Sequence, residues 1–221
     1  MSRVFRVDPA DPTTFGPAVA AAAEALRDGG LVVLPTETVY GIAARPDDPA
    51  VTGRLFEAKR RPAPMNLPVL AVDAAAAWAV GRPVGPAQGL AAAFWPGPLT
   101  LVLPRTERSR PWALGDHETT VAVRVSDHPL SCALVEAAGP VAATSANISG
   151  RPPAEDEAAL LSTFEDQVAV YVVLASGVRR PGGTPSTVFD LTVEPPILLR
   201  SGPIDPADLA RAMAAPPGST P

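Results

Sequence analysis

Short apolar runs alternate with helix-like segments along almost the whole chain, and this alternation restricts the possible folds more than any other feature. Three of the runs are LVVLP at residues 31–35, LPVLAV at 67–72 and LTLVLP at 99–104. Each is short, bounded by turn residues and apolar throughout, which is typical of strands buried on both faces. Segments with helical spacing lie between them and end at glycine or proline. This order predicts an α/β fold, with a mixed sheet because some late strands have hairpin-like spacing.

Proline and glycine separate these segments instead of gathering in one tract, with Pro at 28 and Gly at 17 of 221 positions. We expect a single compact domain over residues 1–205 and a short tail, residues 206–221, that is partly disordered. The expected helices cover residues 16–30, 49–59, 74–80, 88–95 and 129–138, and the remaining expected strands cover residues 119–125, 141–147, 171–177, 186–192 and 197–202.

The chain is acidic overall, with a formal net charge of −5 and a sequence pI near 5.0. This disfavours a protein whose whole surface binds nucleic acid, although a local basic cleft is compatible with it. Cys132 is the single cysteine, and the first residues lack the apolar core of a secretion signal. The apolar runs stop well short of the roughly 20 residues needed to cross a bilayer. We therefore expect a soluble cytoplasmic protein that makes no membrane contact.

Polar side chains follow several of the expected strands, at the edge where open α/β sheets bind their ligands. They supply cations, hydroxyl groups and an amide, and this combination indicates a site for an anionic substrate. The set comprises Thr36, Tyr40, Lys59, Arg61, Arg124, Thr144, Ser145, Asn147, Ser186 and Arg200.

Lys59 is the single lysine beside 17 arginines. It is either a chance survivor of an arginine-rich composition or a position that needs a compact ammonium group, which a planar guanidinium cannot replace. A Walker A loop, a dinucleotide-binding glycine motif and metal-binding motifs are missing, and His128 is expected to cap the helix that follows it. The remaining groups suit nucleotidyl transfer, where positioning and charge neutralisation do most of the work.

Seven segments together resemble the YrdC family and occur in the family's order over roughly residues 15–205. Each alone is a weak signal, whereas seven in order are specific. The resemblance implies a twisted open mixed sheet around a large basic-lined cavity, in the short single-domain form of the family. The segments are PTETVYG at 35–41, KRRP at 59–62, FWPGPLTLVL at 94–103, VRV at 123–125, TSANISG at 144–150, PSTVFDLT at 185–192 and LLRSG at 198–202.

The resemblance also implies an L-threonylcarbamoyladenylate synthase, which is a nucleotidyltransferase. Threonine and bicarbonate would form N-carboxythreonine, whose carboxylate attacks the α-phosphate of ATP and displaces pyrophosphate. The product, threonylcarbamoyl-AMP, would pass to a complex that transfers the threonylcarbamoyl group to an adenosine of certain tRNAs. Mg²⁺ bound to ATP is the implied cofactor, with no metal ligands from protein side chains. Weak tRNA binding and the oligomeric state stay open.

Family roles can be carried over residue by residue. The Lys-x-Arg and Ser-x-Asn pairs, implied to act in catalysis and ATP binding, are Lys59 with Arg61 and Ser145 with Asn147. Arg200 is an implied further nucleotide contact. The implied threonine contacts are Thr36, Tyr40, Arg124, Thr144 and Ser186, with Arg124 pairing to the carboxylate in a bidentate fork.

One departure from the family pattern concerns Met65 and Asn66, which stand where many members have a histidine or lysine. Whether either residue has taken over that polar role stays open. Two alternatives to the synthase also remain. The first is a non-catalytic module that binds tRNA or double-stranded RNA, which the acidic pI disfavours. The second is a carbamoyl-adenylate-forming relative, whose domain normally lies within a much longer chain.

Overall fold

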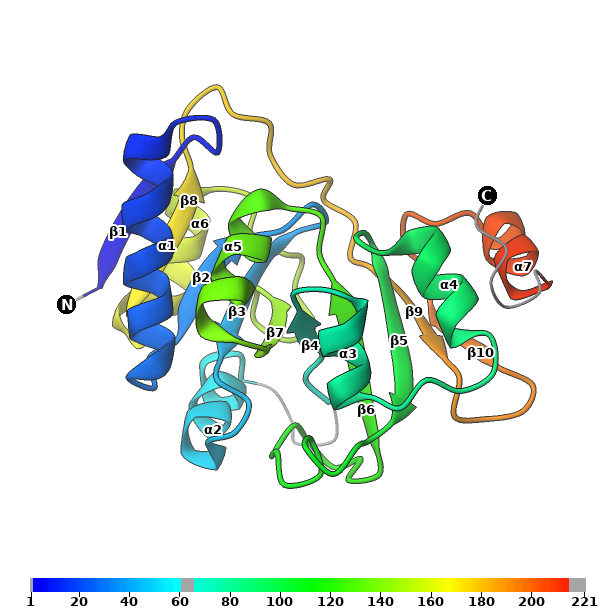
Figure 1. Ribbon diagram of the computed structural model, residues 1–221. Helices are drawn as coiled ribbons and strands as arrows, with labels where there is room; N and C mark the ends of the chain where they lie inside the picture. The colour runs from blue at the N-terminus through cyan, green and yellow to red at the C-terminus, as the bar shows by residue number, and fades with distance from the viewer. Residues whose placement is uncertain (1, 61–65, 215–221) are drawn as a thin grey trace.

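A computed structural model describes residues 2–60 and 66–214 of the chain. Ten strands form one mixed sheet in the order β1-β8-β2-β3-β7-β4-β6-β5-β9-β10 (Figure 1). The predicted α/β class and twisted mixed sheet are confirmed. The strands are β1 (Arg3–Val7), β2 (Val32–Pro35), β3 (Tyr40–Ala44), β4 (Val69–Ala71), β5 (Leu99–Pro104), β6 (Thr120–Val125), β7 (Val141–Ser145), β8 (Val170–Leu174), β9 (Thr187–Asp190) and β10 (Ile197–Arg200).

Most helices begin at a side chain that accepts a hydrogen bond from the first turn. Asp11, Asp48, Asp73 and Asp156 cap helices in this way, and the ring of His128 accepts from Leu130 N at 3.2 Å, as predicted for this histidine. The helices are α1 (Pro12–Arg27), α2 (Pro49–Ala58), α3 (Ala74–Val80), α4 (Ala87–Phe94), α5 (Pro129–Ala138), α6 (Glu157–Phe164) and α7 (Pro206–Ala214), with a 3₁₀ turn at Glu165–Gln167.

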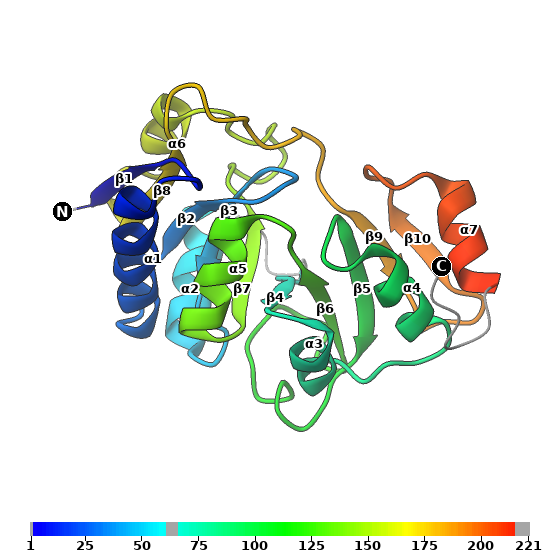
Figure 2. The ribbon, with the colours of Figure 1, turned by 45° about the horizontal axis from the view of Figure 1, so that its top comes forward.

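Buried side chains form two clusters on the two faces of the sheet. Helices α1 and α5 lie side by side over one face of the sheet (Figures 1 and 2). Their apolar side chains pack on β2 and β8. Helices α2, α3, α4 and α6 contribute to the other, larger cluster, together with the buried side chains of β5 and β6. The central strands are therefore covered on both faces, which accounts for their continuous apolar runs.

The sheet is strongly twisted, and the twist decides where the chain can cross it. Strand β9 lies seven positions from β8, and neighbouring strands rotate by roughly 20–25° each, or about 150° in total. The end of β8 and the start of β9 consequently face the same side of the molecule. Residues 175–186, which we call the strap, connect them directly over that side (Figures 1 and 2).

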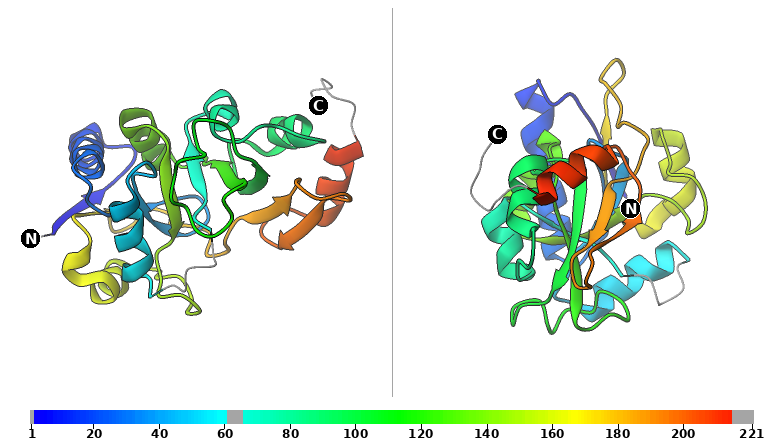
Figure 3. Two further views of the ribbon diagram at one scale, coloured as in Figure 1. Left: turned by 90° about the horizontal axis from the view of Figure 1, so that it is seen from below. Right: turned by 90° about the vertical axis from the view of Figure 1, so that its right-hand side faces the viewer.

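Several elements differ from the sequence-based expectation. Strands β1 and β3 and helix α6 were not predicted, and β3 occupies part of a segment expected to be a turn. Beyond residue 205 the chain forms α7, which packs on α4 and buries Leu209 in the larger cluster. Strand β1 and helix α7 lie at opposite ends of the molecule (Figure 3).

Candidate functional site

A pocket lies where the ends of β2, β6, β7 and β10 meet the start of β9. The space between its walls, open solvent included, is about 510 Å³. Hydroxyl groups and two arginines line it, so its chemistry suits an anionic ligand. Six residues singled out from the sequence line this pocket, which we call the central pocket: Thr36, Arg124, Thr144, Ser145, Ser186 and Arg200.

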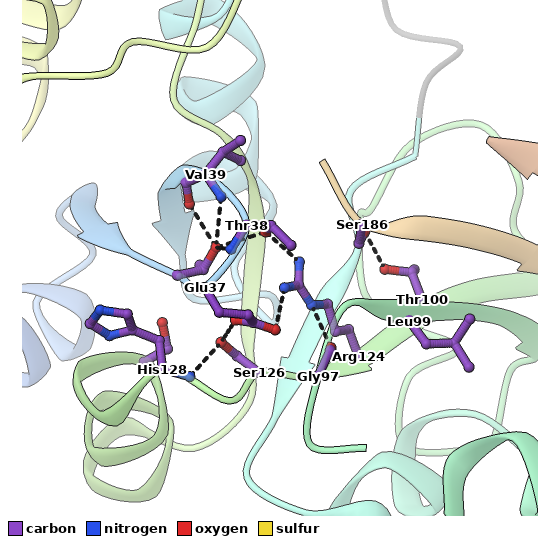
Figure 4. Close-up of polar contacts among 12 residues, drawn as sticks. Glu37, Thr38, Val39, Gly97, Leu99, Thr100, Arg124, Ser126, His128 and Ser186 are labelled. Atoms are coloured by element: carbon purple, nitrogen blue, oxygen red, sulfur yellow. Dashed lines mark hydrogen bonds and ion pairs between the residues drawn. The ribbon is translucent and has the colours of Figure 1, made fainter. Parts of the chain in front are cut away.

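Arg124 is held by three side-chain hydrogen bonds. It lies near the end of β6 with 7% of its surface exposed, and its Nε donates to Gly97 O at 3.1 Å. Its Nη1 donates to Thr38 Oγ1 at 3.0 Å, and its Nη2 donates to a Glu37 carboxylate oxygen at 2.6 Å (Figure 4). The guanidinium is thus fixed by partners from two separate segments of the chain.

Arg200, at the end of β10, contributes the second cation. Its Nε donates to Ser186 O at 2.8 Å and its Nη2 to Ser186 Oγ at 2.9 Å, while Ser186 Oγ lies 2.8 Å from Thr100 Oγ1. Burial, and then the nearby charge of Arg124, lower the pKa of the Arg200 guanidinium. An anion bound between the two arginines would offset their mutual repulsion.

Gly202 allows the chain beyond β10 to pass close to the backbone of residues 185–187, at the start of β9. A Cβ atom on residue 202 would lie 2.3 Å from Thr187 N and 2.6 Å from Pro185 O, so no larger residue fits without moving the backbone. We expect Gly202→Ala to lower the free energy of unfolding by about 1–3 kcal/mol, measured by urea denaturation.

Gly53→Ala is a suitable control for that substitution, because a Cβ atom on residue 53 meets nothing within 4 Å in α2. It should leave the free energy of unfolding unchanged or raise it by up to about 1 kcal/mol. Equal unfolding midpoints for Gly202→Ala and the wild type would contradict the close approach.

Lys59 lies at the carboxyl end of α2 with only 2% of its surface exposed. Its Nζ donates to Ser145 O, to Asn147 O at 2.8 Å and to Asn147 Oδ1 at 3.1 Å. The Ser145 hydroxyl donates to the same Asn147 Oδ1 at 2.6 Å. The structure therefore brings together three of the four residues predicted to act in catalysis. An ammonium group, with three N–H bonds around one atom, suits three acceptors in this arrangement.

The remaining predicted residues make contacts of other kinds. Thr36 Oγ1 donates to Val39 O at 2.6 Å and accepts from two backbone N–H groups, so it shapes the turn after β2. Tyr40 is part of the larger core cluster and lines a separate pocket beneath the strap, where its hydroxyl accepts from Leu174 N at 3.1 Å. Asn66 Oδ1 accepts from His117 N at 3.2 Å. Arg61 and Met65 lie outside the described residues.

The site residues chosen from the sequence did not include three polar residues of the central pocket and its rim, namely Glu37, Thr38 and Thr100. Glu37 and Thr38 lie within the PTETVYG segment that was singled out, and a carboxylate in an otherwise neutral turn was the available signal. Thr100 is the one polar residue of the LTLVLP strand. Its burial beside Ser186 explains why a hydroxyl stands in this apolar run.

Among residues 2–60 and 66–214, no three His, Cys, Asp or Glu side chains gather in a way that could hold a metal ion. The helices of this part of the chain are all too short or too polar to cross a membrane.

The fold and the pocket define an α/β protein with a pocket suited to a small anionic ligand at the strand ends of a twisted mixed sheet. A sequence profile of the Sua5/YciO/YrdC family, described as telomere recombination, matches residues 24–202. The chain belongs to this family. A Chromohalobacter salexigens relative named threonylcarbamoyl-AMP synthase is 39% identical over 176 residues, covering 78% of this chain and 92% of its own.

Solved structures agree with this assignment. P. abyssi Sua5, crystallised with L-threonine, superposes with a TM-score of 0.80 at 32% identity over 97% of this chain. The matched part is 60% of the P. abyssi chain. E. coli YciO superposes with a TM-score of 0.82 at 26% identity, covering 93% of this chain and 98% of its own.

Proposed function

We propose that this chain is an L-threonylcarbamoyladenylate synthase, a nucleotidyltransferase that forms threonylcarbamoyl-AMP and pyrophosphate from threonine, bicarbonate and ATP. The observation that carries the proposal is the central pocket, whose two arginines and hydroxyl groups suit a hydroxylated amino acid. Its support from relatives is the threonine complex of P. abyssi Sua5 and the synthase name of the C. salexigens protein. The catalytic unit is proposed to cover residues 1–205, with α7 packed against it.

Arg124 is the proposed partner of the threonine carboxylate. Three of its N–H groups donate to protein acceptors, and a guanidinium has five. The two that remain match the two oxygens of a carboxylate in a fork. Thr144 and Ser186 line the same pocket and would contact the rest of the amino acid, while Thr36 would act through the turn that it shapes.

ATP is proposed to bind beside the loop that carries Ser145 and Asn147, with Arg200 as a further contact. In the reaction, a carboxylate oxygen of N-carboxythreonine forms a bond to the α-phosphorus as the bond to pyrophosphate breaks. When Lys59 contacts a phosphate oxygen, its ammonium group would exchange one of its hydrogen bonds to the loop, such as that to Ser145 O or Asn147 O, for a hydrogen bond to the phosphate. Arg61 stays part of the proposal through its place in the Lys-x-Arg pair.

Mg²⁺ would enter with ATP, bound to its phosphates. The polar groups of the central pocket are hydroxyl, carbonyl and guanidinium groups. The Glu37 carboxylate at its rim already accepts hydrogen bonds from Arg124 and Ser126. These residues suit a metal carried by the nucleotide instead of one held by the protein. The product would be used in the cytoplasm by the complex that modifies tRNA.

Pyrophosphate release by the purified protein tests the proposal. With ATP and Mg²⁺ present, we expect release that requires both threonine and bicarbonate and that falls when valine replaces threonine. Release that ignores threonine would favour carbamoyl-adenylate chemistry instead. No release under any of these conditions, together with salt-dependent RNA binding, would favour the RNA-binding module.

A further inference from the structure

Glu37 joins two segments of the chain at the rim of the central pocket. One of its carboxylate oxygens accepts from Arg124 Nη2 at 2.6 Å, and the other accepts from Ser126 Oγ at 2.5 Å (Figure 4). Both partners are buried, and the Glu37 side chain itself is 21% exposed. The backbone carbonyl of Glu37 accepts from Gly182 N of the strap at 3.0 Å, so its position is fixed from a third direction.

The contacts of Arg124 determine where its guanidinium points. Gly97, Thr38 and Glu37 each take one N–H group, at the Nε, Nη1 and Nη2 atoms respectively. A planar group held at all three nitrogens has no freedom to rotate about its long side chain. The two remaining N–H groups are therefore presented in one fixed direction, which reduces the cost of ordering the side chain when a carboxylate binds.

The Glu37 charge could act in the opposite sense. A carboxylate beside Arg124 reduces the positive potential of the pocket and should weaken its attraction for an anion. Burial would raise the pKa of Glu37, but Arg124 and the Ser126 hydroxyl outweigh burial and hold it below its ordinary value, so Glu37 is ionised at neutral pH. If the positive potential of the pocket is the dominant effect, removal of the Glu37 charge strengthens anion binding. If the orientation of Arg124 is dominant, the same removal weakens it.

We propose that Glu37 is a positioning residue that orients Arg124 toward a carboxylate substrate, and that orientation outweighs the loss of positive potential. The inference rests on the proposed function, because threonine is the carboxylate in question. Glu37 does not touch the reacting atoms in this proposal. Its effect should appear in threonine binding and should spare ATP binding.

Glu37→Gln tests the inference, since it keeps the side-chain shape and removes the charge that holds Arg124 Nη2. We expect the dissociation constant for threonine, measured by calorimetry without ATP, to rise about 10-fold or more. The KM for ATP should change less than about twofold. Glu24→Gln is the matched control, because Glu24 pairs with Arg3 on the exposed surface and its loss should leave both quantities unchanged.

Ser126→Ala provides a second test in case Glu37→Gln does not fold. It removes the hydroxyl that donates to the other Glu37 oxygen and accepts from His128 N, so threonine binding should weaken in the same direction by a smaller factor. Unchanged or tighter threonine binding in a folded variant would overturn the inference while leaving the proposed function intact. A wild-type protein that binds no threonine would overturn both.

Discussion

Lys59→Ala should reduce pyrophosphate release at least about 100-fold, since removal of one pre-positioned donor from a charged site commonly costs this much. The ammonium group holds Ser145 O, Asn147 O and Asn147 Oδ1 together at the edge of the central pocket. Without it, the loop loses the cation that orders it, and the proposed phosphate site loses a positive charge. Steady-state release with all substrates present measures the loss.

Because Lys59 is buried, Lys59→Ala should also lower the stability of the protein. Acceptors left without a donor should lower the free energy of unfolding by about 1–3 kcal/mol, which urea denaturation would detect. Lys59→Arg should not restore activity, because a planar guanidinium cannot place its N–H groups around a single point. Arg82→Ala, at an exposed residue that is not part of the central-pocket lining, is the control and should behave like the wild type. Near-normal release by folded Lys59→Ala would refute the assigned role.

Arg124→Lys should raise the KM for threonine about 10- to 100-fold, because hydrogen bonds to charged groups contribute about 1.5–3 kcal/mol and an ammonium cannot form the two-pronged contact. It also cannot reach Gly97, Thr38 and Glu37 in the geometry that the guanidinium uses. Initial rates at varied threonine and fixed saturating ATP measure the change.

Arg105→Lys is the matched control for Arg124→Lys. Arg105 is equally buried, at 8% exposed, but it donates to backbone carbonyls such as Trp112 O and Thr120 O, away from the central pocket. Its substitution should lower stability and leave the KM for threonine unchanged. If both variants raised this KM alike, the effect of Arg124→Lys would be a general consequence of losing a buried arginine.

Local signals were sufficient to predict several elements of the fold. The helices Ala74–Val80 and Pro129–Ala138 have the predicted bounds because a capping side chain precedes each and a glycine follows. Strand β3 was not predicted, since its sequence, YGIAA, is rich in small residues. It forms because β2 and β7 pair with its two edges, and such tertiary pairing is not visible in a local pattern.

For the site as well, the sequence was enough to identify residues but not to predict the contacts they make. Chemistry and position within motifs were enough to single out six residues that line the central pocket. They were not enough to predict that Lys59 holds backbone carbonyls, because every carbonyl looks alike in a sequence. Glu37 was missed because its side-chain partners, Arg124 and Ser126, lie 87 and 89 positions further along the chain.

The strap has little spare length. Seven strand spacings of about 4.8 Å correspond to roughly 34 Å along the sheet, and residues 175–186 can extend to at most about 43 Å. Surface loops usually accept insertions and deletions alike. Here an insertion would only add slack, whereas a deletion of a few residues would pull Ser186 from the central pocket. Functional relatives should therefore have a strap of this length or longer, and not a shorter one.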